Sequence, residues 1–291
     1  MTLFLTNHPL LRRFDRWAGP ALAVVALGLL LLETRRPLRR RTRPRPERWW
    51  RNVALATPSL PAMRLTLLPA MVGLAQAAAP RRLLLARLPD PLRLVLELLA
   101  LDYLAYAWHR LLHSPVLWRV HRVHHNDLDM DLTTAWRFHF GEMLASIPVR
   151  AGLPALLGVR PATVIGYEAV FEACTAFHHS NSRLAIGLER VLARVLVTPR
   201  AHGIHHSVVR EQTQSNFGVV LMLWDVLHRT RRLNVPQQSV TIGVPAYPYA
   251  NLQTVPHLLA LPLAPLEPWA HPDGSVPAPT AVVGELSELA E

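Results

Sequence analysis

The sequence predicts an all-α integral membrane protein, with about four to five transmembrane or hairpin helices and a histidine-rich cap in the cytosol. Three observations lead to this prediction. The 291-residue chain is 51% hydrophobic and only 18% charged, against about 25% charged residues in soluble domains. Its apolar runs are separated by basic or proline-containing segments, and eleven of its 15 histidines fall between His109 and His206. This composition excludes a chain that is disordered throughout.

The first spanning helix is predicted at residues 17–32, a run of sixteen residues without a charge. Residues 33–51 then carry nine Arg. A long apolar run with a basic flank is typical of a transmembrane helix whose flank is cytoplasmic. A cleaved signal peptide fits less well, because its basic cluster would precede the apolar run. A buried helix of a soluble protein is the alternative.

Further apolar runs cover residues 65–79, 92–108, 143–159 and 162–177. The last two meet at Gly158 and Pro161, so we expect them to form an antiparallel hairpin. Arg150, inside the first arm, indicates interior packing or a helix that crosses only in part. With the basic flank inside, these crossings put every clustered histidine on one side. We therefore expect a protein of the cell inner membrane whose histidine cluster faces the cytoplasm.

The C-terminal part is rich in proline from Arg231 onward. Residues 252–266 are expected to form an interfacial helix, and residues 268–291 a mobile tail. All 31 basic residues are Arg, and the formal net charge is +11. A basic run can bind nucleic acid, but here it directly follows an apolar helix and no base-reading module is recognisable. We therefore expect contact with anionic membrane lipids and none with nucleic acid.

The histidines form three motifs with helical spacing. They are His109-x-x-x-His113, His121-x-x-His124-His125 and His202-x-x-His205-His206. Residues three and four apart on a helix project from one face, as a shared metal ion requires. The single cysteine, Cys174, excludes an internal disulfide and any site that needs several thiolates. With His179 the motifs supply nine imidazoles, so the pattern predicts a metal-binding cap with two metals and four or five ligands each. Imidazole suits Zn, Cu, Fe and Ni alike.

Other motifs accompany these histidines. They are Asp102-x-x-x-Tyr106-x-x-His109-Arg110-x-x-His113, Trp118-Arg-Val-His121, Arg137-Phe-His139-x-x-Glu142, Phe177-His-His179-Ser-Asn181, Thr198-Pro199-x-x-His202, Asn216-Phe217-Gly218 and Trp224-Asp225. In order and spacing, residues 102–232 resemble the fatty acid hydroxylase and sterol desaturase superfamily. The resemblance divides the chain into membrane anchor helices with an Arg-rich linker (1–91), a catalytic domain (92–232) and a Pro-rich C-terminal segment (233–291).

The resemblance implies an activity. Members are integral membrane proteins in which a cytosolic histidine cap holds two metals, taken to be iron. They use O2 and electrons from a separate donor protein to hydroxylate or desaturate lipids. The implied metal ligands are His109, His113, His121, His124, His125, His139, His179, His202, His205 and His206. Zinc can replace iron in purified protein, because it binds nitrogen sites more tightly.

The chain departs from the family pattern at two places. Phe140 replaces the proline that follows His139 in the family, and residues 227–230 read Leu-His-Arg-Thr where the family has Leu-Phe-Gly-Thr. His178 precedes the matching His179, and we expect it to be a neighbour of the site.

Polar residues near the motifs are candidates for supporting the ligands. A metal-bound histidine usually donates its second ring N–H to a carboxylate or carbonyl. Asp102 lies two helical turns before His109 and is expected to support that face. Asp131, Glu142 and Asn181 are further candidates, and helix capping or surface solvation is the alternative for each.

Two other functions compete with a lipid oxygenase. A metal transporter or sensor would place its polar groups within spanning segments, whereas these histidines lie after or between the apolar runs. A catalytically silent membrane protein with structural zinc is the second alternative. Hydrolase motifs are absent from the sequence. For an oxygenase the substrate stays open among sterol-like lipids, fatty acyl chains, ether lipids and carotenoids.

Overall fold

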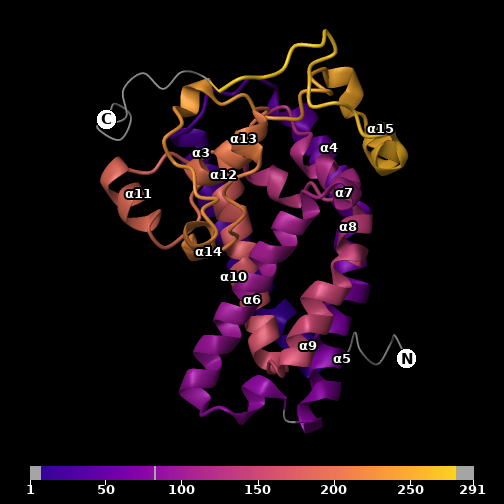
Figure 1. The fold of residues 1–291 in the computed structure, drawn as a ribbon, viewed down its shortest axis with the longest axis vertical. Helices are drawn as coiled ribbons and strands as arrows, with labels where there is room; N and C mark the ends of the chain where they lie inside the picture. Colours follow the sequence, from indigo (N-terminus) through magenta and orange to yellow (C-terminus); the bar gives the residue numbers. More distant parts are fainter. Residues whose placement is uncertain (1–7, 82, 280–291) are drawn as a thin grey trace.

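The computed structural model describes residues 8–81 and 83–279. Within those ranges the chain is helical, with three isolated bridges and no strand (Figure 1). The all-α prediction is therefore confirmed. Of the predicted C-terminal tail, residues 268–279 carry no helix, and residues 280–291 lie outside the described part of the chain.

The N-terminal third forms two long continuous helices. The first joins α2 (Pro9–Arg13), a π turn (Phe14–Ala18) and α3 (Gly19–Arg35). The second joins α4 (Arg45–Ala62), a π turn (Met63–Leu67), α5 (Leu68–Ala78) and a final turn (Ala79–Arg81). By length and apolar composition both can cross a membrane, since about 20 residues suffice. The predicted helices at 17–32 and 65–79 lie within them.

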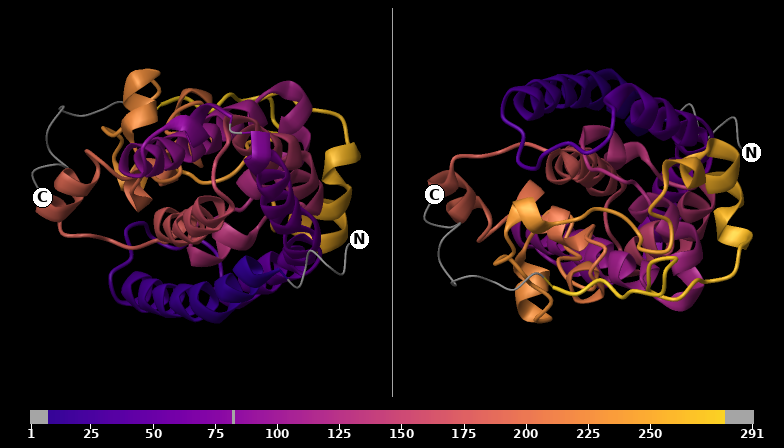
Figure 2. Two further views of the ribbon diagram at one scale, coloured as in Figure 1. Left: turned by 90° about the horizontal axis from the view of Figure 1, so that it is seen from below. Right: turned by 90° about the horizontal axis from the view of Figure 1, so that it is seen from above.

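The first long helix runs along the outside of the molecule, as both views in Figure 2 show. Trp17, Val24 and Leu27 are 70%, 69% and 66% exposed on it. Only 6% of its most apolar window is buried inside the protein. A helix that is apolar on its outer face needs an apolar surrounding, and a bilayer supplies one.

Two further helices have their C-terminal ends at the same end of the molecule. They are α6 (Asp90–Leu112) and α10 (Pro161–His179). Between them the chain passes through α7 (Pro115–His125), a 3-10 turn η5 (Leu132–Trp136), α8 (Phe140–Ala145), a π turn η6 (Pro148–Gly152) and α9 (Leu153–Leu157). We call the place where α6 and α10 finish the histidine end.

The expected hairpin of residues 143–177 has a tight turn but an uneven first arm. Gly158 closes α9 with φ 79°, a left-handed conformation that favours glycine. The chain resumes as α10 three residues later, whereas the first arm is broken into α8, η6 and α9. Arg150, on η6, packs inward against Glu168 and over the Phe171 ring. Its interior packing agrees with the sequence interpretation, and the count of four to five crossings stays a prediction.

Short helices form the histidine end. They are α11 (Ile186–Leu192), α12 (Pro199–His205), α13 (Arg210–Thr213), α14 (Leu223–Leu227) and α15 (Val255–Ala260). The apolar core lies mainly at the opposite end, where Leu68, Val72 and Leu101 pack with Val164. A second cluster joins Leu55 and Val123 to Leu258 of α15. Instead of the expected continuous helix at 252–266, the chain forms the short helix α15 with a 3-10 turn on either side, and this segment packs on the protein.

The basic linker, residues 36–44, folds onto the histidine end. The Arg39 backbone N–H donates to Asn181 Oδ1 at 2.8 Å, and Arg39 Nη1 donates to Gln237 Oε1 at 2.7 Å. The linker and the clustered histidines thus lie at the same end, as the order of apolar runs requires. The turns at residues 83–90 and 158–161 lie together at the other end, where Arg160 pairs with Asp90 and Glu97.

This arrangement predicts which sites share a side of the membrane. In a Cys174→Ser background, Arg40→Cys and Arg210→Cys should react with an impermeant thiol reagent from the same side, because both lie exposed at the histidine end. Leu84→Cys, exposed at the opposite end, should react from the other side. Labelling of intact cells and inverted vesicles measures this. If Arg40→Cys and Arg210→Cys reacted from different sides, the histidine end could not lie on one side of a membrane that the long helices span.

Candidate metal centre

Nine of the ten predicted ligands converge in two groups. In each group every member offers one ring nitrogen, and these nitrogens all lie within 4.8 Å of one another. The first histidine group is His109, His113, His121, His125 and His205. The second histidine group is His124, His179, His202 and His206.

Helix geometry explains how the motifs serve both groups. His121 and His125 are four residues apart on α7 and belong to the first group, while His124 belongs to the second. On α12 the pair with that spacing, His202 and His206, belongs to the second group, and His205 to the first. Neighbouring positions such as 124 and 125 point about 100° apart on a helix. Each His-x-x-His-His motif therefore contributes to two sites at once.

The two histidine groups are buried except for His113, which is half-buried. His125, His205 and His206 are fully inaccessible to solvent. Buried nitrogens without any hydrogen-bond partner occur on six of the nine rings: His113, His121, His125, His202, His205 and His206. Buried polar atoms are almost always paired, and a group that is not paired calls for an explanation such as an ion. The donor set therefore fits metal ions.

A second nitrogen on many of the rings is anchored by the protein. The Nδ1 atoms of His109, His179 and His205 lie 2.8, 2.8 and 2.6 Å from the carbonyl oxygens of Phe217, Thr175 and Ser215. Those of His121 and His124 lie 3.1 and 3.2 Å from Glu142 Oε2 and the Arg137 carbonyl. An Nδ1–H that donates in this way fixes the ring and leaves Nε2 free to bind.

In the second group the Nε2 atoms approach one another directly. His179 Nε2 lies 3.0 Å from both His124 Nε2 and His202 Nε2, and His206 Nε2 lies 3.2 Å from His202 Nε2. Burial, reinforced by neighbouring imidazoles, lowers the pKa of His124 and His206 well below the ordinary value. These rings are therefore neutral at pH 7, which is the protonation state that binds metal.

The four predicted supporting residues occupy different positions. Glu142 Oε2 lies 3.1 Å from Nδ1 of His121, one of the predicted ligands. Asp102 accepts from Tyr167 Oη at 2.8 Å, Trp224 Nε1 at 2.7 Å and the Leu221 N–H. None of these donors is a histidine, so Asp102 ties α6 to α10 and α14.

Asp131 and Asn181 hold the N-terminal segment onto the histidine end. Asp131 accepts from Arg48 Nη1 at 2.7 Å and from Trp49 Nε1 at 3.1 Å. Asn181 bonds the backbone of Arg39 in both directions, and its own N–H donates to Glu33 Oε2. Both residues therefore hold the segment of residues 33–49 in position.

His139 and His178 lie outside both histidine groups. His139 caps α8, where its Nδ1 accepts from the Gly141 N–H at 3.0 Å, and its Nε2 lies 3.2 Å from the Leu259 carbonyl. Both of its nitrogens are therefore engaged. The His178 ring centroid lies 4.0 Å from that of His202, and its Nδ1 lies 3.1 Å from the Val219 carbonyl.

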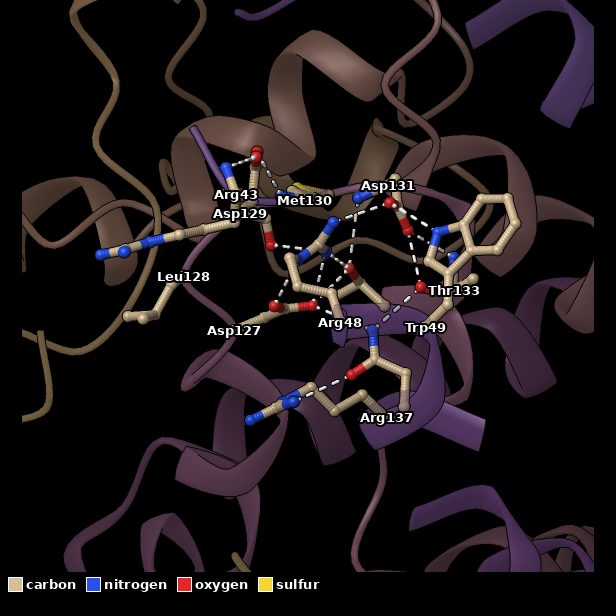
Figure 3. A network of polar contacts seen from close by, with 12 residues as sticks. Arg43, Arg48, Trp49, Asp127, Leu128, Asp129, Met130, Asp131, Thr133 and Arg137 are labelled. Carbon is tan, nitrogen blue, oxygen red and sulfur yellow. Dashed lines mark hydrogen bonds and ion pairs between the residues drawn. The ribbon is translucent and has the colours of Figure 1, made fainter. Parts of the chain in front are cut away.

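A buried ionic network, which the sequence analysis did not identify, fixes the end of α7 (Figure 3). Arg48 of α4 donates to Asp127 through Nε at 2.9 Å and Nη2 at 2.8 Å, and to Asp131. Burial alone would raise the pKa of Asp127, but the Arg48 and Arg137 guanidiniums lower it well below its ordinary value. Asp127 stands two residues after His125. The sequence pattern that indicates this network is Asp127-x-Asp129-x-Asp131, directly after the histidine motif.

An apolar pocket opens next to the histidine groups. It contains about 900 Å³ of empty space, solvent opening included. Its lining includes His109, His121, His124, His179 and His202, together with apolar residues among which are Leu60, Met63, Trp108, Leu112, Phe138, Met143 and Phe171. The apolar walls suit a chain-like organic molecule.

Comparisons with known proteins agree on one family. Residues 94–230 match the family model described as Fatty acid hydroxylase. The chain is 32% identical over 158 residues to Ornithine lipid hydroxylase OlsE of Rhizobium tropici, covering 54% of this chain and 46% of that protein. It is 28% identical over 134 residues to human Alkylglycerol monooxygenase, covering 45% of this chain and 29% of that protein. The chain thus spans less than half of the length of these relatives. No solved structure matches it.

The two groups predict how metal content responds to substitution. Protein purified in detergent should carry about two metal ions per chain, one for each group. His125→Ala and His206→Ala, each removing a ligand with buried unpaired nitrogens, should lower that number. His271→Ala, outside both groups, should leave it unchanged. Elemental analysis measures the ratio, and one ion per chain in the unaltered protein would contradict the two-site arrangement.

The ionic network predicts a difference between two neighbouring arginines of α4. Arg48→Leu should lower the free energy of unfolding by about 3–5 kcal/mol, because it leaves Asp127 buried without its partner. Arg51→Leu removes only an exposed pair with Glu47 and should cost about 0.3–0.5 kcal/mol. Chemical unfolding in detergent, followed by tryptophan fluorescence, compares the two. Equal losses would show that Asp127 does not depend on Arg48.

Proposed function

Because residues 94–230 belong to the fatty acid hydroxylase and sterol desaturase superfamily, we propose that this protein is a membrane-bound oxygenase that hydroxylates a lipid at a centre of two iron ions. The family assignment confirms the resemblance found in the motifs. The two histidine groups would hold one iron ion each.

The observation that carries the proposal is the position of the histidine groups beside the apolar pocket. Five of the nine clustered histidines also line the pocket. A chain bound there would lie against the metal centre and be shielded from water by side chains such as Trp108, Met143 and Phe171. Exclusion of water protects reactive species from side reactions.

The overall reaction needs a redox-active metal and a supply of electrons. One atom of O2 enters a C–H bond to give C–OH, and the other leaves as water with two protons and two electrons. Bound iron would supply the O2 chemistry, whereas zinc has no redox chemistry. We therefore propose iron as the working metal and a separate protein as the electron donor.

The residues of the chain prepare the site. The backbone carbonyls of Phe217, Thr175 and Ser215 hold three ligand rings by Nδ1, and Glu142 holds His121. Such outer partners fix the tautomer and make the ring a better ligand. The two groups, with five and four histidines, would give the metals unequal coordination.

The relatives suggest the class of substrate. By their names, one hydroxylates an ornithine lipid and the other oxidises an alkylglycerol. Both names describe lipids that combine a polar part with hydrocarbon chains, which agrees with an apolar pocket that also has polar lining residues such as Arg150 and Glu172. We propose a polar lipid as substrate, with hydroxylation preferred over desaturation.

The membrane setting is part of the proposal. Two helices have the length and composition to cross a bilayer, and the outer face of the first is apolar and exposed. The exposed Arg40 and Arg43 of the basic linker lie at the histidine end, where they would contact anionic lipids of the cytoplasmic leaflet. The histidine end would then face the cytoplasm from the inner membrane.

The two alternative functions explain fewer of the structural observations. A transporter needs metal ligands along a spanning path, but both histidine groups lie at one end of the molecule, where α6 and α10 finish. A structural zinc protein would explain the histidines but not a large apolar pocket next to them.

Lipid analysis tests the proposed reaction. Cells that express the protein should contain a lipid with one additional oxygen atom, and that atom should carry the label when the cells grow under isotopically labelled O2. Cells expressing His125→Ala at the same level should lack the product, because one metal site has lost a ligand.

A fully metal-loaded protein that changes no lipid would contradict the proposal and favour structural zinc. If the additional oxygen atom carried label from labelled water and none from labelled O2, an oxygenase would be excluded.

A further inference from the structure

Helix α10 carries a row of polar residues on an otherwise apolar helix. Glu168, Glu172, Thr175 and His179 stand at positions i, i+4, i+7 and i+11. This spacing places them on one face. The row therefore leads along the helix from η6 to the second histidine group.

The row borders the apolar pocket. Glu172, Thr175 and His179 line it, and so does Arg150 from η6. Arg150 forms an ion pair with Glu168, and its guanidinium lies 4.5 Å from the centroid of the Phe171 ring. Arg150 thus pairs directly with Glu168 and acts on Glu172, which lines the pocket, only through its electrostatic field.

Two polar groups of this row have no hydrogen-bond partner in the protein. Thr175 is only 4% exposed, and its hydroxyl oxygen is buried without a partner. Within residues 8–81 and 83–279 no group donates a hydrogen bond to Glu172. Buried polar groups are almost always paired, and an unpaired one destabilises the fold by about 1–3 kcal/mol. The Thr175 hydroxyl is thus buried and unpaired, and one turn away the half-buried Glu172 carboxyl, which lines the same pocket, accepts no hydrogen bond; together they indicate a ligand.

We propose that Glu172 and Thr175 form a subsite for a hydrogen-bond donor of the lipid substrate, a hydroxyl or an amide N–H. The Glu172 carboxyl and the Thr175 hydroxyl accept hydrogen bonds from that donor, and the apolar walls contact the hydrocarbon chain. This inference rests on the proposed function, because it assigns a role in substrate recognition at the same site.

The subsite also sets which carbon reaches the metal centre. Glu172 and His179 are seven residues apart, so they lie about 10 Å apart along the helix axis. A lipid held by its donor group at Glu172 presents to the histidines a carbon at that distance along its chain. A lipid without the donor leaves both polar groups unpaired, which a site of this kind rejects.

Arg150 defines the chemistry of the subsite. It neutralises one of the two neighbouring carboxyl groups, Glu168, and so leaves the acceptor capacity of the other to the ligand. Its partner Glu168 lies eleven residues before His179, about 16 Å along the helix axis. An anionic lipid group is disfavoured there because two glutamates flank a single arginine.

Binding to zinc-loaded protein tests the subsite without turnover, because zinc has no redox chemistry. The probes are two pairs of lipids. The first pair is the hexadecyl monoether of glycerol and the same ether with both hydroxyls methylated. The second is N-methylhexadecanamide and N,N-dimethylhexadecanamide. The unaltered protein should bind the donor-bearing member of at least one pair about tenfold more tightly, the worth of one hydrogen bond to a buried acceptor. Equal binding within both pairs would overturn the proposal.

Variants separate recognition from folding. Glu172→Leu and Thr175→Val should abolish the preference and leave the affinity for the methylated lipids unchanged, whereas Glu172→Gln, which keeps an acceptor, should retain it. Glu211→Leu, an exposed glutamate of α13, is the matched control and should retain the full preference. Metal content equal to that of the unaltered protein establishes that each variant is folded. A preference that survives in both Glu172→Leu and Thr175→Val would show that other residues bind the donor.

The outcomes distinguish this inference from the proposed function. A preference in zinc-loaded protein combined with no oxygenated lipid in cells would reject the oxygenase and leave a lipid-binding site. Oxygenated product combined with no preference would reject the subsite alone.

Discussion

The structure depends on the burial of nine imidazoles around two points. Neutral rings with unpaired nitrogens in a dry interior are costly, and six of the nine rings carry such a nitrogen. For the four such rings of the first group, bound metal would remove that cost, and metal binding would thus be coupled to folding of the histidine end. For the rings to meet, the ends of α6 and α10 and the histidine motifs of α7 and α12 must come together at one end of the molecule.

The segment that signals membrane orientation also builds the site. Residues 33–51 predicted a cytoplasmic basic flank, and the structure buries two of these arginines. Arg39 is 4% exposed and joins Asn181 to Gln237, while Arg48 is 5% exposed and holds Asp127 behind the α7 histidines. The exposed members, such as Arg40 and Arg43, are the ones free to contact lipid. One run of sequence thus anchors the helices and supports the ligands.

Local patterns in the sequence predicted the helical character, the interior packing of Arg150 and the tight turn at Gly158, because each depends on neighbours within one or two turns. They could not predict the division of each His-x-x-His-His motif between two groups, since this depends on how α7 and α12 are rotated against each other. Asp102 shows the same limit. Its spacing from His109 suggested support of a ligand, but its partners Tyr167 and Trp224 are 65 and 122 residues away in the chain. The helical spacing of Glu172 and Thr175 can be read from the sequence, but their proposed role depends on the pocket that both residues line.

The central claim is that the histidines form two unequal metal sites, one with five and one with four imidazoles. Mössbauer spectroscopy of iron-loaded protein tests it most directly, because the spectrum reports the number and proportion of distinct iron environments. Two iron environments in equal amounts are expected, and His124→Ala should change the one held by the second group, to which its ring belongs. A single iron environment, with one ion per chain, would contradict it.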